Sequence, residues 1–136
     1  MMKLRQVFGI SVFVALGILL STAGAFAATK PWNIPKEDSA RKNPIKADKA
    51  SIEAGKAIYM KNCANCHGEK ADGKGPAASA LNPKPPALTG KAYHKANTDG
   101  DLYYKIAVGR MPMPGWEVML SEKDIWNVVN YLRSLQ

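Results

Sequence analysis

The residues Cys63, Cys66 and His67 form the pattern in this chain that points most directly to a chemistry. Two thiols three positions apart can each bond one vinyl group of a porphyrin, and the following histidine can then bind the iron through a neutral ring nitrogen. These two cysteines are the only ones in the chain, so none remains for a structural disulfide. The spacing predicts one covalent haem c, with Cys63 and Cys66 as thioethers and His67 as the proximal iron ligand.

Two other kinds of site use cysteines at this spacing, and the sequence disfavours both. A thioredoxin-like redox pair is expected near a βαβ pattern, but the chain has no run of β-branched residues to supply parallel strands. A structural zinc site needs four protein ligands. Apart from His67, the chain has one further histidine, His94, and no further cysteine.

The second axial position of a haem iron decides its function, because a methionine there favours electron transfer and an open position permits ligand binding. Prolines favour an extended loop over residues 111–116, where methionines need not fill a core. Met119 and Met60 fit better as gap-filling core residues, and His94 fits an exposed surface. The candidates for this position are Met111, Met113, Met119, His94 and, as the weakest, a lysine; the proline-rich loop favours the first two.

The N-terminal segment has the order of a secretory signal peptide. Lys3 and Arg5 precede an apolar run over residues 7–20, and Ala25-Phe26-Ala27 follows as a cleavage site. Residues 1–27 are therefore predicted to be removed after export to the periplasm. The alternative is an uncleaved membrane anchor, because the apolar stretch is about long enough to span a bilayer.

Removal of residues 1–27 would leave a chain of the length of one domain. This chain would have 17 basic and 11 acidic residues and therefore a net charge of +6. Such a surface is either simply well solvated or steers the protein toward acidic docking surfaces of redox partners. Nucleic acid is a poor candidate partner, because export is predicted and no binding motif is present.

The remaining sequence predicts an all-α domain over residues 51–136, preceded by an extended arm over residues 28–50. The sequence does not indicate which part of the domain Trp32, in this arm, would contact. Helices are expected from Ser51 toward Met60, from about Asp99 to Val108, and from Ser121 onward. Ser121 and Asp124 have the spacing of a capping box.

Residues 68–90 are expected to form a loop rich in glycine and proline. The apolar stripe of the last helix is predicted to pack on the face that runs from Gly55 to Tyr59. This stripe comprises Ile125, Val128, Val129, Leu132 and Leu135.

Over residues 51–136 the chain resembles a class I monohaem c-type cytochrome of the bacterial, secreted kind. The resemblance implies a small all-α fold, with about three to four helices wrapped around one covalently bound haem and with long loops. It rests on separated pieces of sequence: Gly55 and Tyr59, Cys63 to Gly68, residues 73–77, residues 81–85, Gly109, residues 113–116, and Tyr131-Leu132.

The resemblance also implies roles for two residues outside the pentapeptide. Pro85 would offer a backbone carbonyl that fixes the orientation of His67. Met113 would be the distal iron ligand, because in similar sequences the methionine precedes Pro-x-aromatic and lies shortly before the Leu-Ser that opens the last helix. Met111 repeats the Met-Pro step two residues earlier and stays an alternative.

The function implied is that of a monomeric one-electron carrier, cycling between Fe(III) and Fe(II) and passing electrons between a redox protein donor and acceptor. The chain shows no acid, base and nucleophile set, so it is not expected to be an enzyme. Two alternatives stay open: a haem subunit or tethered relay of a larger redox complex, and an open-site haem enzyme or gas sensor. Because the core is thin, the chain without haem is expected to be largely unfolded.

Overall fold

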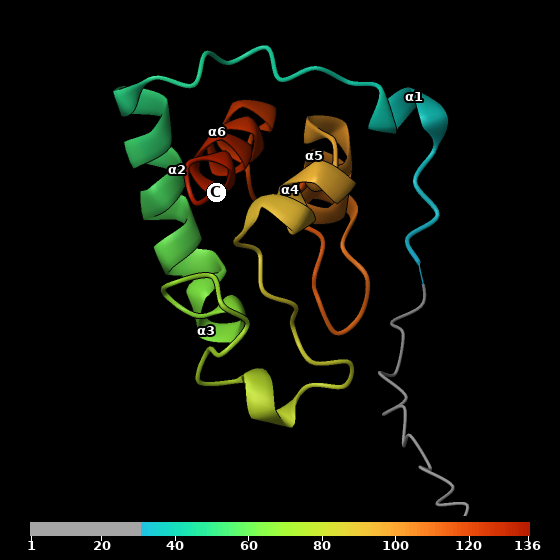
Figure 1. The fold of residues 1–136 in the computed structure, drawn as a ribbon, viewed down its shortest axis with the longest axis vertical. Coiled ribbons are helices and arrows are strands. Elements are labelled where there is room, and N and C mark those ends of the chain that lie inside the picture. Colours follow the sequence, from blue (N-terminus) through green and yellow to red (C-terminus); the bar gives the residue numbers. More distant parts are fainter. Residues whose placement is uncertain (1–30) are drawn as a thin grey trace, which may run out of the picture.

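The computed structural model describes residues 31–136, which form helices and loops with no β-strand (Figure 1). This confirms the predicted all-α class, while the predicted signal peptide or anchor at 1–27 lies outside the described residues. None of the described helices is long and apolar enough to cross a membrane. The elements are α1 (Lys36–Ser39), α2 (Lys49–Asn62), α3 (Ala64–His67), the 3₁₀ helix η1 (Ala78–Ala80), α4 (Lys91–Ala96), α5 (Asp99–Val108) and α6 (Glu122–Arg133).

The frame of the domain is the packing of α2 against α6, which lie side by side in Figure 1. A β-carbon on Gly55 would lie 1.9 Å from the carbonyl oxygen of Asn127, so only glycine allows the two backbones to approach this closely. One turn further on, the rings of Tyr59 and Tyr131 meet at 5.2 Å between centroids. The predicted packing of the last helix on the face from Gly55 to Tyr59 is thus confirmed.

The helix boundaries follow from side-chain caps. The helix predicted from Ser51 begins two residues earlier, because the side chain of Asp48 accepts a hydrogen bond from the Ser51 amide and caps α2. The predicted capping box of Ser121 and Asp124 is present at α6. Helix α5 has the predicted bounds, and its own capping box joins Thr98 and Asp101.

Three short helices and η1 were not predicted, since four to six residues give too little periodicity to recognise. Of these, α1 lies in the segment predicted to be an extended arm, and η1 lies in the predicted loop.

The described part of the arm packs on the domain, whereas an extended tether was expected. Helix α1 meets the start of α5, where a β-carbon on Gly100 would lie 2.0 Å from the Asp38 carbonyl oxygen. From there the chain crosses over α5 and α6 to reach α2 (Figure 1). On this path Asn43 donates a 2.8 Å hydrogen bond to the side-chain oxygen of Asn130, and the Arg41 guanidinium lies 4.1 Å from the Tyr103 ring centroid.

Candidate haem site

Helix α3 places the two thiols and the imidazole on one short turn. Helix α2 ends at Cys63, whose carbonyl oxygen accepts from the amides of Cys66 at 3.1 Å and His67 at 2.9 Å. The chain therefore restarts as a tight turn directly after α2. Each of the three predicted residues is brought to the same end of that helix, as the contiguous sequence requires.

Both cysteines are free thiols and are partly shielded from solvent. Burial, with a smaller contribution from Cys66, raises the pKa of the Cys63 thiol to about 12. Redox-active cysteines of the thioredoxin kind have lowered pKa values that favour the thiolate. The surroundings of Cys63 are thus those of a structural attachment point, and they weigh against a dithiol–disulfide catalyst.

The ring of His67 is largely buried, and its Nδ1 atom makes no hydrogen bond of regular geometry to a described residue. Burial lowers the pKa of His67, and the backbone carbonyl of Pro86 opposes that shift. The neutral imidazole favoured by burial is the form that binds a metal.

The predicted contact between the Pro85 carbonyl and His67 stays a prediction, because the Nδ1 atom of His67 has no hydrogen-bond partner among the described residues. The carbonyl oxygen of Pro85 would lie 2.5 Å from a β-carbon built on Gly73, so this part of the loop lies close against Pro85.

The loop after α3 folds back and holds the turn through its backbone. Amides of this loop donate to the carbonyl oxygens of His67 at 2.8 Å, Cys66 at 3.2 Å and Asn65 at 2.9 Å; their donors are Gly73, Gly75 and Ala77. The buried hydroxyl of Tyr59 adds a 2.8 Å hydrogen bond to the carbonyl oxygen of Gly68. The orientation of this turn is thus fixed by bonds from both sides.

The loop with the candidate distal ligands folds back on the end of α5. The amide of Trp116 donates to the carbonyl oxygens of Ile106 at 3.0 Å and Ala107 at 2.9 Å. Within the loop, Arg110 and Met113 exchange two backbone hydrogen bonds of 2.8 and 2.9 Å. The side chain of Met113 is partly buried against the hydrophobic core, whereas that of Met111 is 83% exposed.

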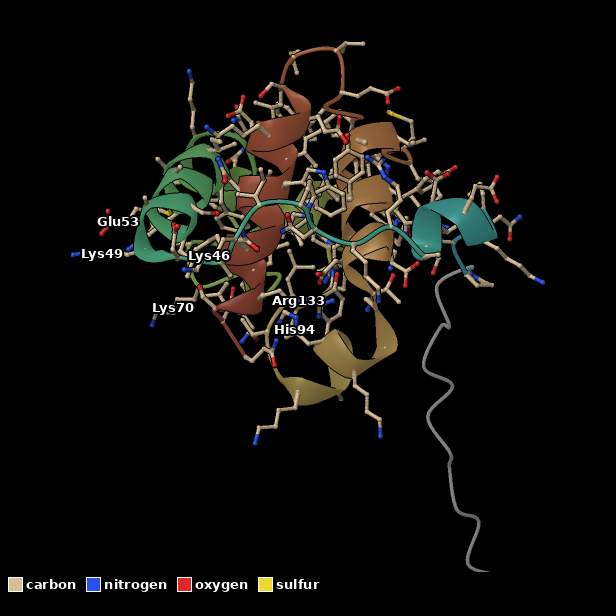
Figure 2. The ribbon with its side chains drawn as sticks, turned by 90° about the horizontal axis from the view of Figure 1, so that it is seen from above. Lys46, Lys49, Glu53, Lys70, His94 and Arg133 are labelled. Carbon is tan, nitrogen blue, oxygen red and sulfur yellow. The ribbon has the colours of Figure 1, made fainter. Side chains whose placement is uncertain are left out.

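The other distal candidates lie in different surroundings from those expected. His94 is buried, not on the surface, and its Nδ1 lies 3.3 Å from the Arg133 guanidinium (Figure 2). Because arginine can only donate, Nδ1 must be the acceptor, whereas the Nε2 atom is buried and has no hydrogen-bond partner in the described part of the chain. Met60 and Met119, expected to fill gaps in the core, are 38% and 63% exposed.

The residues present fit a haem better than a bare metal ion. Among the described residues, no group of three or more histidine, cysteine or acidic side chains is placed to hold a metal ion. A single histidine needs a porphyrin to complete the ligand set of an iron, and two free thiols beside it provide the means of attachment. The fold and the site together define a small all-α, c-type haem-binding domain.

Comparison with known proteins agrees with this class. The family model described as Cytochrome c matches residues 52–136, well over half of the chain. The chain belongs to the cytochrome c family, whose members carry a covalently bound haem c with its iron and take part in electron transfer.

One curated relative is described as the Cbb3-type cytochrome c oxidase subunit CcoP of Azospirillum brasilense. It is 33% identical over 94 residues, which cover 68% of this chain and 31% of the relative. The chain thus spans about a third of the length of that relative.

Two solved structures are also similar. A chain of the reducing HAO-like protein complex of Kuenenia stuttgartiensis has a TM-score of 0.61 and 31% identity, covering 68% of this chain and 46% of that one. Cytochrome cL of Methylophaga aminisulfidivorans has a TM-score of 0.50 and 31% identity, covering 64% of this chain and 54% of that one.

Proposed function

We propose that this protein is a one-electron carrier of the periplasm whose haem iron is held between His67 and Met113. The observation that carries the proposal is the contrast between two methionines of one loop. Met113 packs partly buried against the core, whereas the side chain of Met111 is 83% exposed, which supports Met113 over Met111 as the residue that closes the iron.

Each residue of the site has a defined task in this proposal. Cys63 and Cys66 anchor the haem through thioethers, and His67 binds the iron as a neutral imidazole. A backbone carbonyl, that of Pro85 or of the adjacent Pro86, would receive the Nδ1 proton and fix the tautomer and the ring plane. When bound, the haem supplies exchange of one electron between Fe(III) and Fe(II) with both axial ligands kept.

The protein around the site is built to change little. The turn of α3 is bonded from the loop and from Tyr59, and the loop of Met113 is bonded to the end of α5. A ligand set that stays in place in both oxidation states suits fast electron exchange, and the basic surface suits brief encounters with acidic redox partners. A monomer is sufficient for this role.

A second candidate is a haem subunit or relay within a larger redox complex, and the packed arm favours it. Relatives and structural neighbours include parts of such assemblies, a cbb3-type oxidase subunit and an HAO-like complex. If residues 1–27 stay uncleaved, the arm would join the domain to a membrane anchor by a short, well-held connection. The candidates separate by the N-terminal residue of the native protein and by whether it washes free of membranes.

The decisive experiment on the site is an optical spectrum of the oxidised, haem-loaded protein. A long-wavelength sulfur-to-iron absorption band and slow binding of carbon monoxide to the reduced form at neutral pH are expected. Absence of the band together with rapid carbon monoxide binding would replace the electron carrier by an open-site enzyme or sensor.

A further inference from the structure

We propose that Trp32, in the N-terminal arm, is a positioning residue for the distal iron ligand and acts on Met113 through Arg110. This inference rests on the proposed function, because it takes Met113 as that ligand. It assigns to the arm a task at the haem site, in place of a role as a mere connection.

The first step is the contact between the arm and the side chain of Arg110. The Arg110 guanidinium lies 4.4 Å from the centroid of the Trp32 ring, within the range of a cation–π contact. Its Nη1 atom also donates a 3.2 Å hydrogen bond to the carbonyl oxygen of Pro31. Two consecutive arm residues therefore hold one side chain of the distal loop.

The second step is the link from Arg110 to Met113. The two residues exchange both of their backbone hydrogen bonds, at 2.8 and 2.9 Å, across a tight turn. A displacement of the Arg110 backbone therefore moves the Met113 backbone with it. The path from the arm to the ligand comprises one ring contact and one pair of hydrogen bonds, with no further residue between them.

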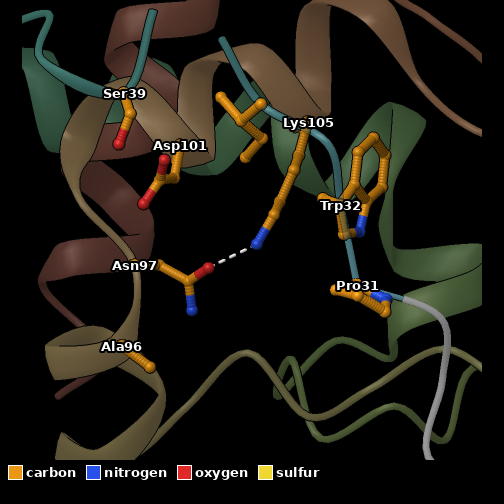
Figure 3. A pocket seen from close by; sticks show the side chains of 8 residues that line it. Pro31, Trp32, Ser39, Ala96, Asn97, Asp101 and Lys105 are labelled. Atoms are coloured by element: carbon orange, nitrogen blue, oxygen red, sulfur yellow. Dashed lines mark hydrogen bonds between the residues drawn. The ribbon is translucent and has the colours of Figure 1, made fainter. Parts of the chain in front are cut away.

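The third step is what holds Trp32 itself. The Lys105 ammonium, from α5, lies 5.9 Å from the centroid of the same ring. Figure 3 shows Trp32 beside Lys105, whose Nζ donates to the side-chain oxygen of Asn97, in an open pocket of about 400 Å³. The Trp32 ring therefore contacts a cation of α5 and a cation of the distal loop, which links the loop to the helix.

Residues 31–48 lie outside the part matched by the family model, so the arm contacts add to the matched domain. The arm has a second anchor that serves as a control. Arg41 stacks on Tyr103 and pairs with Glu122 at the start of α6. Loss of the Trp32 side chain or of the Arg41 side chain would weaken the packing of the arm. Only the loss of Trp32 would also remove a contact with the distal loop.

The test compares Trp32→Ala, Trp32→Phe and Arg41→Ala in the haem-loaded protein, after far-ultraviolet circular dichroism and haem content confirm equal folding. Added imidazole must displace the methionine to bind ferric iron. Its apparent affinity is expected to rise about two- to fivefold in Trp32→Ala, the range that corresponds to losing one exposed cation–π contact. Arg41→Ala should bind imidazole as the wild type does, and Trp32→Phe should restore most of the difference.

Amide hydrogen exchange at Arg110 and Met113 supplies a readout that does not need the iron bond. Both amides should exchange faster in Trp32→Ala than in Arg41→Ala. Unchanged exchange and imidazole affinity in Trp32→Ala, or equal effects of the two variants, would overturn the inference. Absence of the sulfur-to-iron band in the wild type would instead overturn the proposed function, and the exchange data would still report whether the arm holds the loop.

Discussion

The two sides of the haem site are held in different ways. On the proximal side, Cys63, Cys66 and His67 lie within five residues, and backbone hydrogen bonds from α2 and from the following loop fix their turn. On the distal side, Met113 lies on a loop that touches the end of α5 and, through Arg110, the N-terminal arm. The proposed proximal ligand is fixed by its own neighbours in sequence, whereas the proposed distal ligand depends on segments far away.

This difference indicates where the site can be adjusted. A local turn with several backbone bonds tolerates the loss of any one of them, because the others keep the chain in place. A loop held at few points responds to the loss of a single contact. Changes that tune ligand strength should therefore concentrate on the distal side, and changes on the proximal side should act on stability or on attachment as a whole.

The largest effect is expected when the proximal attachment is removed. The double variant Cys63→Ala/Cys66→Ala should lose covalent haem and, with it, most of the folded structure, because the small core packs around that group. Haem staining and thermal melting followed by circular dichroism measure both losses. Haem-free protein that melts in a cooperative transition would show that α2, α5 and α6 suffice for the fold.

Removal of the distal ligand should leave the fold and abolish one spectroscopic feature. Met113→Ala is expected to eliminate the long-wavelength band of the oxidised protein, since the sulfur that closes the iron is gone. Met111→Ala is the matched control, because its side chain is 83% exposed. Loss of the band in the Met111 variant alone would move the assignment to that residue.

A smaller effect, on stability, is expected from Tyr59→Phe. The Gly68 carbonyl accepts hydrogen bonds from the Tyr59 hydroxyl and from the Ala71 amide, the latter at 3.0 Å, and this variant removes the first of them. Unfolding free energy should fall by about 1–2 kcal/mol, with the absorption band and imidazole affinity unchanged. Tyr131→Phe, which keeps the ring pair, is the control in denaturant titrations. A change of imidazole affinity as large as that of Trp32→Ala would contradict the idea of a redundant proximal side.

The smallest effect concerns pH and a contact away from both ligands. Burial and the Arg133 guanidinium lower the pKa of His94 from its ordinary value of 6.5. The unfolded chain then takes up a proton more readily than the folded one, so the stability contributed by neutral His94 is present above about pH 6.5 and is lost as pH falls below it.

Denaturation midpoints at about pH 7.5 and about pH 5.5 would measure this loss against the ordinary histidine pKa. The His94→Gln variant, which has no group titrating there, should lose less stability on acidification. Arg133 and Asp99 are the charged groups that face this contact in the described structure. An equal change of the denaturation midpoint with pH in the wild type and the variant would show that His94 does not cause the loss of stability.

The sequence predicted much of the frame because the signals there are local and strong. The capping box at Ser121, the bounds of α5 and the packing of α6 on Gly55 and Tyr59 each follow from spacing within one helix. The short helices α1 and α4 gave no such signal. The predicted burial was wrong for three residues, because burial depends on which segment covers a residue. Met60 and Met119 are exposed where core positions were predicted, and His94 is buried where a surface position was predicted.

By itself, the sequence predicted haem attachment through Cys63 and Cys66 and iron binding through His67, because contiguous residues on one turn cannot be separated by the fold. Only the tertiary structure decided that Met113 packs against the core while Met111 is exposed, and that Trp32 reaches Arg110. Those outcomes depend on how distant segments pack. No local pattern encodes that packing, since it is the sum of many weak contacts made at once.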